Sequence, residues 1–248
     1  MNAVEIEPAL DKLKKADKIA VLTGAGMSVQ SGVAPFRGEG GLWEKFDPNE
    51  YAHIGAFKSD PEKCWELFKL QIEEISEAQP NEGHEALVSL ESEGVEAVIT
   101  QNVDGLHGKA GSTEVVELHG SLSRLVCPGC GKMYETDEKK DIIYDGEIPR
   151  CDCGKITRPD VVMFGEMLPM DAVDRARGLS QGADLMIVVG TSAVVQPAAS
   201  LPILAKRNGA EILEVNIERT PLTDNFTDHF LRGKAGEVLS KIVKNING

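Results

Sequence analysis

Four of the five cysteines fall into two close pairs, a pattern typical of a metal site. Cys127 and Cys130 flank Pro-Gly, Cys151 and Cys153 flank a single Asp, and twenty residues separate the pairs. Two pairs of thiolates can complete a tetrahedral shell around one Zn2+, and four cysteine ligands leave no position open for substrate. Two disulfides or four free thiols are the alternatives. We favour one structural zinc, because clustered cysteines without an export signal usually indicate metal.

A glycine-rich turn follows the first apolar run of the chain. The run 19–23 leads directly into Gly24-Ala-Gly-Met-Ser28. Backbone amides in such a turn can approach a pyrophosphate, although a Gly-x-Gly pattern alone is weak and this one departs from the usual dinucleotide fingerprint. The stretch 29–41 has the composition of an extended loop, in which Arg37 could face a phosphate or a carboxylate. A simple turn and a solvated arginine are the alternatives.

One of the five histidines is a candidate general base. A lone histidine is usually structural or solvated, and we interpret His53, His84, His107 and His229 in that way. His119 differs, because it follows the apolar run 115–118 and so lies at a predicted strand end. The pKa of an imidazole lies close to working pH, which suits it to proton transfer.

Short apolar runs rich in Val and Ile position these residues. We predict buried parallel strands at 19–23, 97–100, 115–118, 185–189 and 212–215. We predict helices at 9–15, 61–77, 84–93 and 235–246. This alternation indicates an α/β fold with a Rossmann-like, doubly wound parallel sheet. Ligands of such sheets bind beyond the carboxyl ends of the strands, so Gly24, Gln101, His119, Gly190 and Asn216 should meet at one crevice.

Two stretches interrupt the alternation and predict a smaller domain beside the sheet. We assign 1–37, 82–120 and 161–248 to the Rossmann-like domain that carries the nucleotide site. We assign 38–81 and 121–160 to a small helical and zinc-binding domain made of two insertions. A crevice between two such domains is a common place for a small ligand.

Composition narrows the class of protein. The net charge of −14, from 40 acidic and 26 basic residues, argues against direct nucleic-acid binding, which needs a basic surface. It would favour basic partners such as lysine-rich protein segments, although acidity also simply supports solubility. No apolar run reaches the roughly 18 residues of a membrane span. We expect a cytoplasmic protein without a membrane partner, and the sequence leaves its oligomeric state unknown.

Eight motifs in chain order resemble the sirtuin family. They are Gly24-Ala-Gly-Met-Ser28, Phe36-Arg-Gly38, Gln101-Asn-Val-Asp104, Leu118-His-Gly120, the cysteine pairs, Phe164-Gly-Glu166, Gly190-Thr-Ser192 and Gly233-Lys-Ala235. The match runs from about Lys18 to Ala235 and is most similar to the compact prokaryotic members. The resemblance implies an NAD-dependent protein-lysine deacylase with NAD as co-substrate and one structural zinc. Acetylated lysine segments of proteins would enter the cleft between the two domains.

The resemblance also implies a role for individual residues. His119 matches the catalytic histidine, and Asn102 would orient the ribose and the nicotinamide amide. The implied NAD contacts are Gly24, Ala25, Gly26, Ser28, Phe36, Arg37, Gln101, Asn102, Asp104, Gly190, Thr191, Ser192, Asn216 and Ala235. The implied substrate contacts, which would pair with the substrate backbone as an added strand, are Val161, Val162, Phe164, Gly165 and Glu166.

Two departures from the family pattern bear on the site. Ala34-Pro35 precedes Phe36-Arg37 where the family usually has Pro followed by Asp or Thr, so the backbone of this loop is uncertain. Members that remove acidic acyl groups carry a Tyr, with an Arg three residues later, on the long helix. The matching positions here are Phe68 and Gln71. Without that arginine a buried succinyl carboxylate lacks a charge partner, so we expect neutral acyl groups such as acetyl.

Two other classes of function fit parts of the pattern. An ADP-ribosyltransferase or NAD glycohydrolase would share the nucleotide site and differ in its products. A zinc-bearing module that senses NAD without catalysis would be expected to lack His119 or Asn102, and both are present. The protein substrate and the preferred acyl length cannot be read from the sequence.

Overall fold

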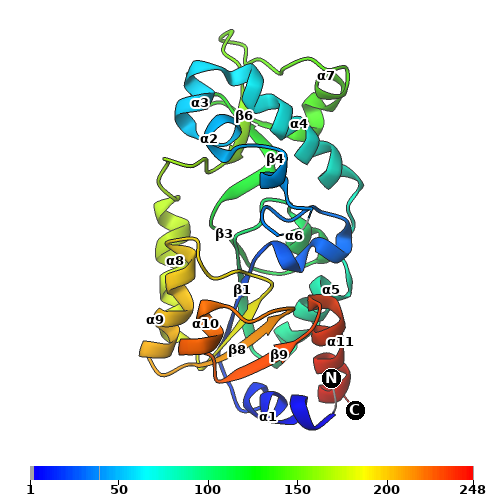
Figure 1. Cartoon of the computed structure of the whole chain (residues 1–248), viewed down its shortest axis with the longest axis vertical. Helices are drawn as coiled ribbons and strands as arrows, with labels where there is room; N and C mark the ends of the chain where they lie inside the picture. The colour runs from blue at the N-terminus through cyan, green and yellow to red at the C-terminus, as the bar shows by residue number, and fades with distance from the viewer. Residues whose placement is uncertain (1–2, 39, 248) are drawn as a thin grey trace.

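The computed structural model describes residues 3–38 and 40–247, and Figure 1 shows an elongated molecule with a larger lower part and a smaller upper part. The larger part is built on a sheet of six parallel strands in the order β3-β2-β1-β7-β8-β9. These strands are β1 (Ile19–Thr23), β2 (Val95–Thr100), β3 (Val115–Glu117), β7 (Leu185–Val189), β8 (Glu211–Asn216) and β9 (His229–Arg232). The predicted doubly wound parallel sheet is confirmed, and only β9 was not expected.

Helices cover both faces of this sheet, because successive side chains of a strand point to opposite sides. On β1, Ile19 and Val21 pack on the face covered by helices α1, α5 and α11, whereas Ala20 and Leu22 pack on the face covered by α8, α9 and α10. The helices are α1 (Ala3–Leu13), α5 (Glu82–Ser89), α8 (Met170–Gly182), α9 (Leu201–Arg207), α10 (Pro221–Asn225) and α11 (Ala235–Asn247). The strands are therefore buried on both faces, as their apolar runs predict.

The smaller part holds a second, antiparallel sheet in the order β5-β4-β6. Its strands are β4 (Gly120–Val126), β5 (Met133–Glu135) and β6 (Arg158–Val161), and beside them lie α2 (Pro48–Tyr51), α3 (Ile54–Ser59), α4 (Pro61–Glu77) and α7 (Lys140–Tyr144). All of these elements except α2 share one apolar core, which includes Trp65, Phe68 and Leu125. The division into 38–81 and 121–160 stays a proposal. Strand β4 begins one residue before the second range, and strand β6 ends one residue after it.

The long helix α4 connects the core of the smaller part to the middle of the molecule. The Asp60 side chain caps it by accepting from the amide of Lys63 at 3.1 Å, and Pro61 occupies its first turn. Its apolar stripe buries Cys64, which is fully covered. Trp65 in the same stripe donates to the carbonyl of Thr157 at 2.8 Å, which ties the two insertions together.

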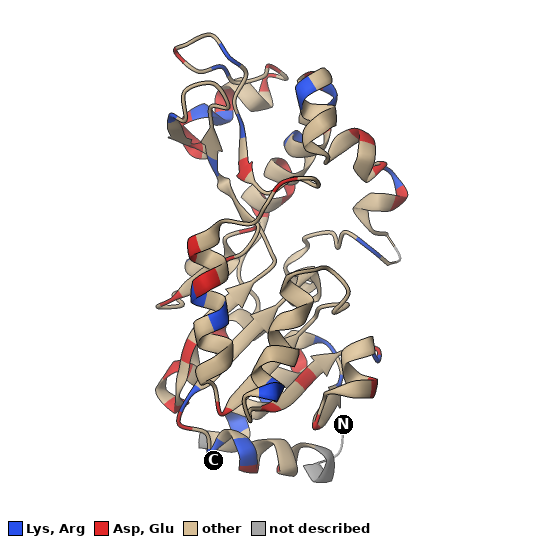
Figure 2. Cartoon of the chain, turned by 90° about the vertical axis from the view of Figure 1, so that its left-hand side faces the viewer, with Lys and Arg blue, Asp and Glu red and all other residues tan. Residues whose placement is uncertain are grey.

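The surface shows no strong segregation of charge. In Figure 2 acidic and basic residues are spread along the ribbon of both parts of the molecule, and neither sign gathers in one region of that view. Among residues 3–38 and 40–247, no helix is both long and apolar enough to span a bilayer.

Candidate functional site

The carboxyl ends of four parallel strands meet through side-chain hydrogen bonds. Gln101, after β2, donates from Nε2 to Oγ1 of Thr191, after β7, at 2.9 Å. Asn216, the last residue of β8, donates to the carbonyl oxygen of Thr191 at 2.8 Å. Asn102 donates from Nδ2 to the carbonyl oxygen of Gly24, after β1, at 3.1 Å. The structure therefore brings together predicted site residues from segments as far apart in the chain as Gly24 and Asn216.

The glycines at this edge let two loops pack backbone to backbone. A Cβ on Gly26 would lie 2.8 Å from Cα of Gly190, and a Cβ on Gly24 would lie 2.8 Å from Cβ of Thr191. Gly190 has a φ of 60°, and a Cβ there would lie 2.6 Å from the amide nitrogen of Met27. Each added carbon would collide with backbone or a buried side chain, so the sequence needs glycine at these places.

Three amides at this contact point have no acceptor within the chain. The amides of Gly24 and Gly26 donate to the carbonyls of Val189 and Gly190 at 3.0 and 2.8 Å. Among the described residues, those of Ala25, Thr191 and Ser192 donate to nothing. Unpaired amides grouped beside a strand end suit the oxygens of a pyrophosphate, so this arrangement fits the phosphates of NAD.

A partly open pocket lies beside the glycine-rich turn. Predicted site residues from three segments line it: Ala25, Ser28, Phe36, Asn102 and Asp104. Residues from the loop 33–42 and from α4 complete the wall: Val33, Ala34, Leu42, Gln71, Glu74, Ile75, together with Val103. Sequence reasoning did not place Glu74 here. Because Glu74 lies three residues after Gln71 on the amphipathic helix, the two share one helix face, and this spacing could have predicted its place in the pocket wall.

Asp104 is the charged group held most tightly in this pocket. Its carboxylate accepts from the Ser28 hydroxyl at 2.6 Å and from the amide of Leu106 at 2.9 Å. Burial raises the pKa of Asp104, and these two hydrogen bonds oppose that shift. Asn102 also donates to the Ser28 hydroxyl oxygen, at 3.2 Å. Together Ser28, Asn102 and Asp104 present oriented polar groups to a ligand in this pocket.

His119 has a defined tautomer. Its Nδ1 lies 2.8 Å from the carbonyl oxygen of Gln101. A carbonyl can only accept, so Nδ1 carries the proton and Nε2 keeps its lone pair. Burial lowers the pKa of His119, and the hydrogen bond to Gln101 partly offsets that shift. The imidazole is therefore neutral at neutral pH, with a nitrogen free to accept a proton.

The predicted substrate segment begins directly beside this histidine. The Val162 amide donates to the carbonyl of His119 at 2.9 Å, and Val161 pairs with Gly120 at the end of β6. Phe164 is 41% exposed, although its amide and carbonyl bond to Ala52 and Ile54 of the smaller part at 2.9 and 3.0 Å. The Phe164 backbone is thus already paired within the chain.

The rest of the segment is fixed around Glu166. The Glu166 carboxylate accepts from the amide of Met163 at 3.0 Å and pairs with the guanidinium of Arg158 at 2.8 Å. Among the described residues the Gly165 amide finds no acceptor. The Gly165 amide is thus available to a partner strand, and the role of this segment in substrate binding stays a prediction.

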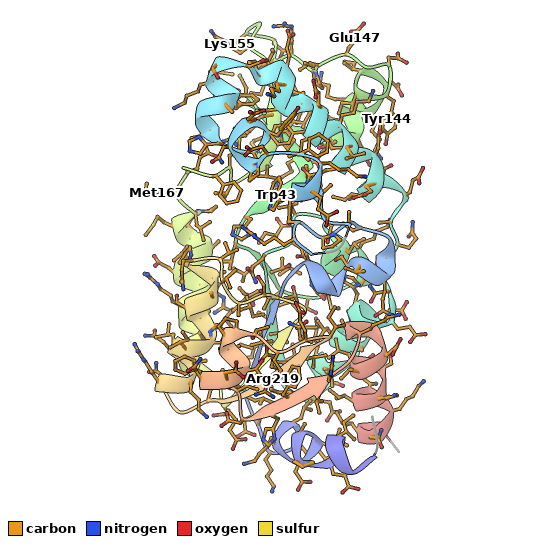
Figure 3. The ribbon with its side chains drawn as sticks, in the orientation of Figure 1. Trp43, Tyr144, Glu147, Lys155, Met167 and Arg219 are labelled. Carbon is orange, nitrogen blue, oxygen red and sulfur yellow. The ribbon has the colours of Figure 1, made fainter. Side chains whose placement is uncertain are left out.

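Trp43 is an aromatic residue of the site that sequence reasoning missed. Its ring centroid lies 5.2 Å from that of Phe36 and 6.1 Å from that of Phe164. Figure 3 shows Trp43 between the two parts of the molecule. It follows four glycines in a loop without periodicity, and its large aromatic side chain in that setting was the only signal. Phe36 and Phe164 are thereby joined by one aromatic bridge across the cleft.

Two predicted cofactor residues lie apart from this cluster. Arg37 is exposed, and no hydrogen bond or ion pair joins it to the described chain. Ala235 is buried at the first turn of α11, where the next amide, of Gly236, donates to the Gln30 side chain at 2.9 Å. Neither contacts the pocket in this structure.

Two buried histidines lie behind the strand ends. His107, in α6 (Leu106–Ala110), contacts the Thr23 hydroxyl through Nε2 at 2.9 Å, and its ring centroid lies 4.8 Å from that of His84. Within the described chain, Nδ1 of His107 and Nε2 of His84 have no hydrogen-bond partner. Burial lowers the pKa of His84 to about 4 and that of His107 to about 3, so both are neutral.

The four clustered cysteines form the predicted metal centre. Their sulfurs all lie within 4.8 Å of one another, and none of the four forms a disulfide. Cys127 and Cys153 are 3.5 Å apart between sulfurs, as are Cys130 and Cys151. Zinc–sulfur bonds of about 2.3 Å require sulfur separations close to these values. The donor set fits a closed structural zinc.

Known proteins with a similar sequence and structure show the family to which this chain belongs. The model of the Sir2 family matches residues 24–197. "NAD-dependent protein deacylase 1" of Archaeoglobus fulgidus is 47% identical over 242 residues, which are 97% of each chain. A Sir2 homolog–NAD complex superposes with a TM-score of 0.90 at 46% identity, covering 97% of this chain and 93% of that one. A complex of Sir2, a p53 peptide and NAD+ gives a TM-score of 0.89 at 38% identity, with 98% of both chains covered.

Proposed function

This chain belongs to the Sir2 family of NAD-dependent protein deacylases, and from that premise we propose that it transfers an acetyl group from protein lysine to ADP-ribose with His119 as general base. One observation carries the proposal. His119 bonds through Nδ1 to Gln101 of the nucleotide site and through its carbonyl to Val162 of the predicted substrate segment. A single residue therefore connects the two places where the reactants would bind.

NAD would lie along the carboxyl edge of the sheet. The unpaired amides of Ala25, Thr191 and Ser192 support a site for its phosphates, and Asn216 supports one for the adenosine half. The pocket beside Phe36, Asn102 and Asp104 would hold the nicotinamide and its ribose. The Sir2 homolog–NAD complex supports this assignment of the co-substrate.

The acylated lysine would enter between the two parts of the molecule. Its amide oxygen would attack C1′ of the nicotinamide ribose as nicotinamide leaves, with Asn102 and Asp104 orienting the ribose. Nε2 of His119 would then accept a proton from a ribose hydroxyl, which requires the neutral imidazole that burial favours. Phe36 would exclude water from the reacting carbon and so limit simple hydrolysis of NAD. One water would then add to the acyl carbon as its bond to the lysine nitrogen breaks. The products would be free lysine, nicotinamide and O-acetyl-ADP-ribose.

Neutral acyl groups should be preferred over succinyl. Gln71 and Glu74 line the side of this pocket that α4 forms, which the acyl group would approach, and none of its described lining residues is a lysine or an arginine. The carboxylate of Glu74 accepts from the amide of Ala34 at 3.3 Å, which holds a negative charge at the wall. A succinyl carboxylate would lose its hydration there without gaining a cation. A neutral acyl chain has no such cost.

The four cysteines would hold one zinc that stabilises the smaller part. A closed tetrathiolate shell supplies no open position for catalysis, so the zinc would fix β4, β5 and the loop 150–155 relative to one another. Lysine segments of proteins would be the substrates, as the p53 peptide in the Sir2 complex supports.

The deciding experiment mixes the purified protein with an acetyl-lysine peptide, with and without NAD. We expect nicotinamide release to require NAD and to match the loss of acetyl mass from the peptide, with O-acetyl-ADP-ribose as the second product. Free ADP-ribose, or ADP-ribose attached to protein without peptide deacetylation, would instead identify a glycohydrolase or an ADP-ribosyltransferase. A succinyl peptide of the same sequence tests the acyl preference in the same assay.

A further inference from the structure

Tyr134 in β5 places its hydroxyl against one sulfur of the cysteine cluster. The oxygen lies 3.3 Å from Sγ of Cys151, and it also accepts from the backbone amide of Asp152 at 3.3 Å. Because the amide already supplies a proton toward this oxygen, the hydroxyl hydrogen is available for the sulfur. The tyrosine ring is 9% exposed, so water does not compete freely for this contact.

The sulfurs divide into a buried pair and an exposed pair. Cys127 and Cys151 are buried, whereas Cys130 and Cys153 are exposed. Exposed thiolates can be solvated by water, but buried ones depend on donors from the protein. The Gly129 amide contacts the sulfur of Cys127 at 3.4 Å, and Tyr134 contacts that of Cys151. Each buried sulfur therefore has a donor of its own.

Two lysines flank the ring of Tyr134. Nζ of Lys132 lies 5.0 Å from the ring centroid and that of Lys139 lies 4.9 Å from it. A zinc with four thiolates carries a net charge of −2, so nearby ammonium groups stabilise it. Cations over the ring also draw electron density from the phenol, which strengthens its hydroxyl as a donor.

We propose that the hydroxyl of Tyr134 donates a hydrogen bond to the zinc-bound thiolate of Cys151 and slows the loss of zinc from this protein. The inference rests on the structural zinc assigned above, and it does not depend on the deacylase chemistry. Tyr134 acts on the metal through Cys151 and touches neither the metal nor the substrates. Its loss should weaken zinc retention and leave the nucleotide site intact.

Tyr134→Phe tests this directly, because it removes the hydroxyl and keeps the ring in the core. Zinc transfer from the native protein to a chromogenic chelator in excess gives the release rate without any activity assay. We expect the variant to release zinc on the order of 10-fold faster than the wild type, in line with other outer-shell partners of metal ligands. Equilibrium competition with the same chelator should show weaker affinity in the same direction.

Tyr144→Phe is the matched control, because Tyr144 lies on α7 of the same part, is 43% exposed and has no contact with the cysteines (Figure 3). Its release rate should equal that of the wild type. An unchanged rate and affinity for Tyr134→Phe, or an equal increase in Tyr144→Phe, would overturn the proposal. A wild-type protein that purifies without zinc would overturn it as well, whereas failure of deacylation in a zinc-loaded protein would bear only on the proposed function.

Discussion

Nδ1 of His119 lies 2.8 Å from the carbonyl oxygen of Gln101, and this contact fixes which nitrogen of the imidazole can act as a base. Gln101 in turn bonds to Thr191 at the end of β7, so the orientation of the histidine depends on two neighbouring strands of the sheet. The ring is held by Gln101 of the proposed nucleotide site, and its main chain is held by Val162 of the proposed substrate segment. Rigid support of this kind is what a positioned general base requires.

His119→Ala should abolish deacetylation while the protein stays folded. Loss of a general base costs about 100-fold or more in turnover, and here kcat should fall without a comparable change in the affinity for NAD. Steady-state kinetics with an acetyl-lysine peptide measure the fall in kcat. Zinc content and circular dichroism are the controls for folding. Turnover at the wild-type rate would remove His119 from the mechanism.

The pH profile of the same reaction gives a second test of this residue. Burial lowers the pKa of His119, and a base works only when unprotonated, so activity should be constant at neutral pH and fall as the pH drops through that lowered value. The acidic limb of kcat/KM should therefore lie below about 6.5, the ordinary pKa of histidine. A limb above that value would contradict the assignment.

Gly26→Ala should damage the nucleotide site more than the fold. The new Cβ would lie 2.8 Å from Cα and 2.9 Å from the carbonyl oxygen of Gly190, so the two phosphate-facing loops must separate. We expect a loss of about 10- to 100-fold in kcat/KM for NAD, because small displacements of positioned groups are costly. Gly178→Ala on the exposed face of α8 meets nothing within 4 Å and serves as the control. It should leave the kinetics unchanged and stabilise the helix by about 0.5–1 kcal/mol.

The parts of the site that could be predicted are those that depend on local pattern. Parallel strands place their carboxyl ends at one edge, so apolar runs ending at Gly24, Gln101 and Gly190 were enough to predict that these residues meet. The metal centre could also be predicted from local pattern, because each close pair of cysteines lies within one short turn. Both inferences needed only short stretches of sequence.

The parts that could not be predicted depend on contacts between distant segments. Strand β4 pairs with β6 more than 30 residues later, and neither has the apolar run of a buried strand. Trp43 reaches Phe164 only because the loop that carries it folds over the cleft. Arg37 is exposed, and no hydrogen bond or ion pair to the described residues fixes its direction, so its contact with a phosphate or a carboxylate stays a prediction.

Gln71→Arg should raise the relative activity toward succinyl-lysine. Gln71 is 8% exposed and lines the pocket, so a guanidinium there would offer a desolvated partner to an acidic acyl group. Combining it with Glu74→Gln prevents the new arginine from pairing with that carboxylate. We expect the ratio of kcat/KM for succinyl to acetyl peptide to increase about 10-fold or more. Gln71→Met, which adds no charge, should leave this ratio low, and an equal rise in both variants would argue against charge pairing.

The buried pair His84 and His107 should make stability depend on mildly acidic pH. Their pKa values in the folded protein are lowered to about 4 and about 3, and in the unfolded chain each returns to about 6.5. Above pH 6.5 both states hold the neutral imidazole, so the free energy of unfolding does not change on this account. Below 6.5 the unfolded chain binds protons that the folded protein cannot, and the free energy of unfolding decreases by about 1.4 kcal/mol per pH unit for each histidine until the folded pKa is reached. Urea unfolding at pH 7.5 and 5.5, with zinc retention monitored, measures this loss. In the His84→Gln/His107→Gln variant the free energy of unfolding should differ much less between the two pH values than in the wild type. Equal pH dependence in the variant and the wild type would show that the two histidines are not buried as neutral groups.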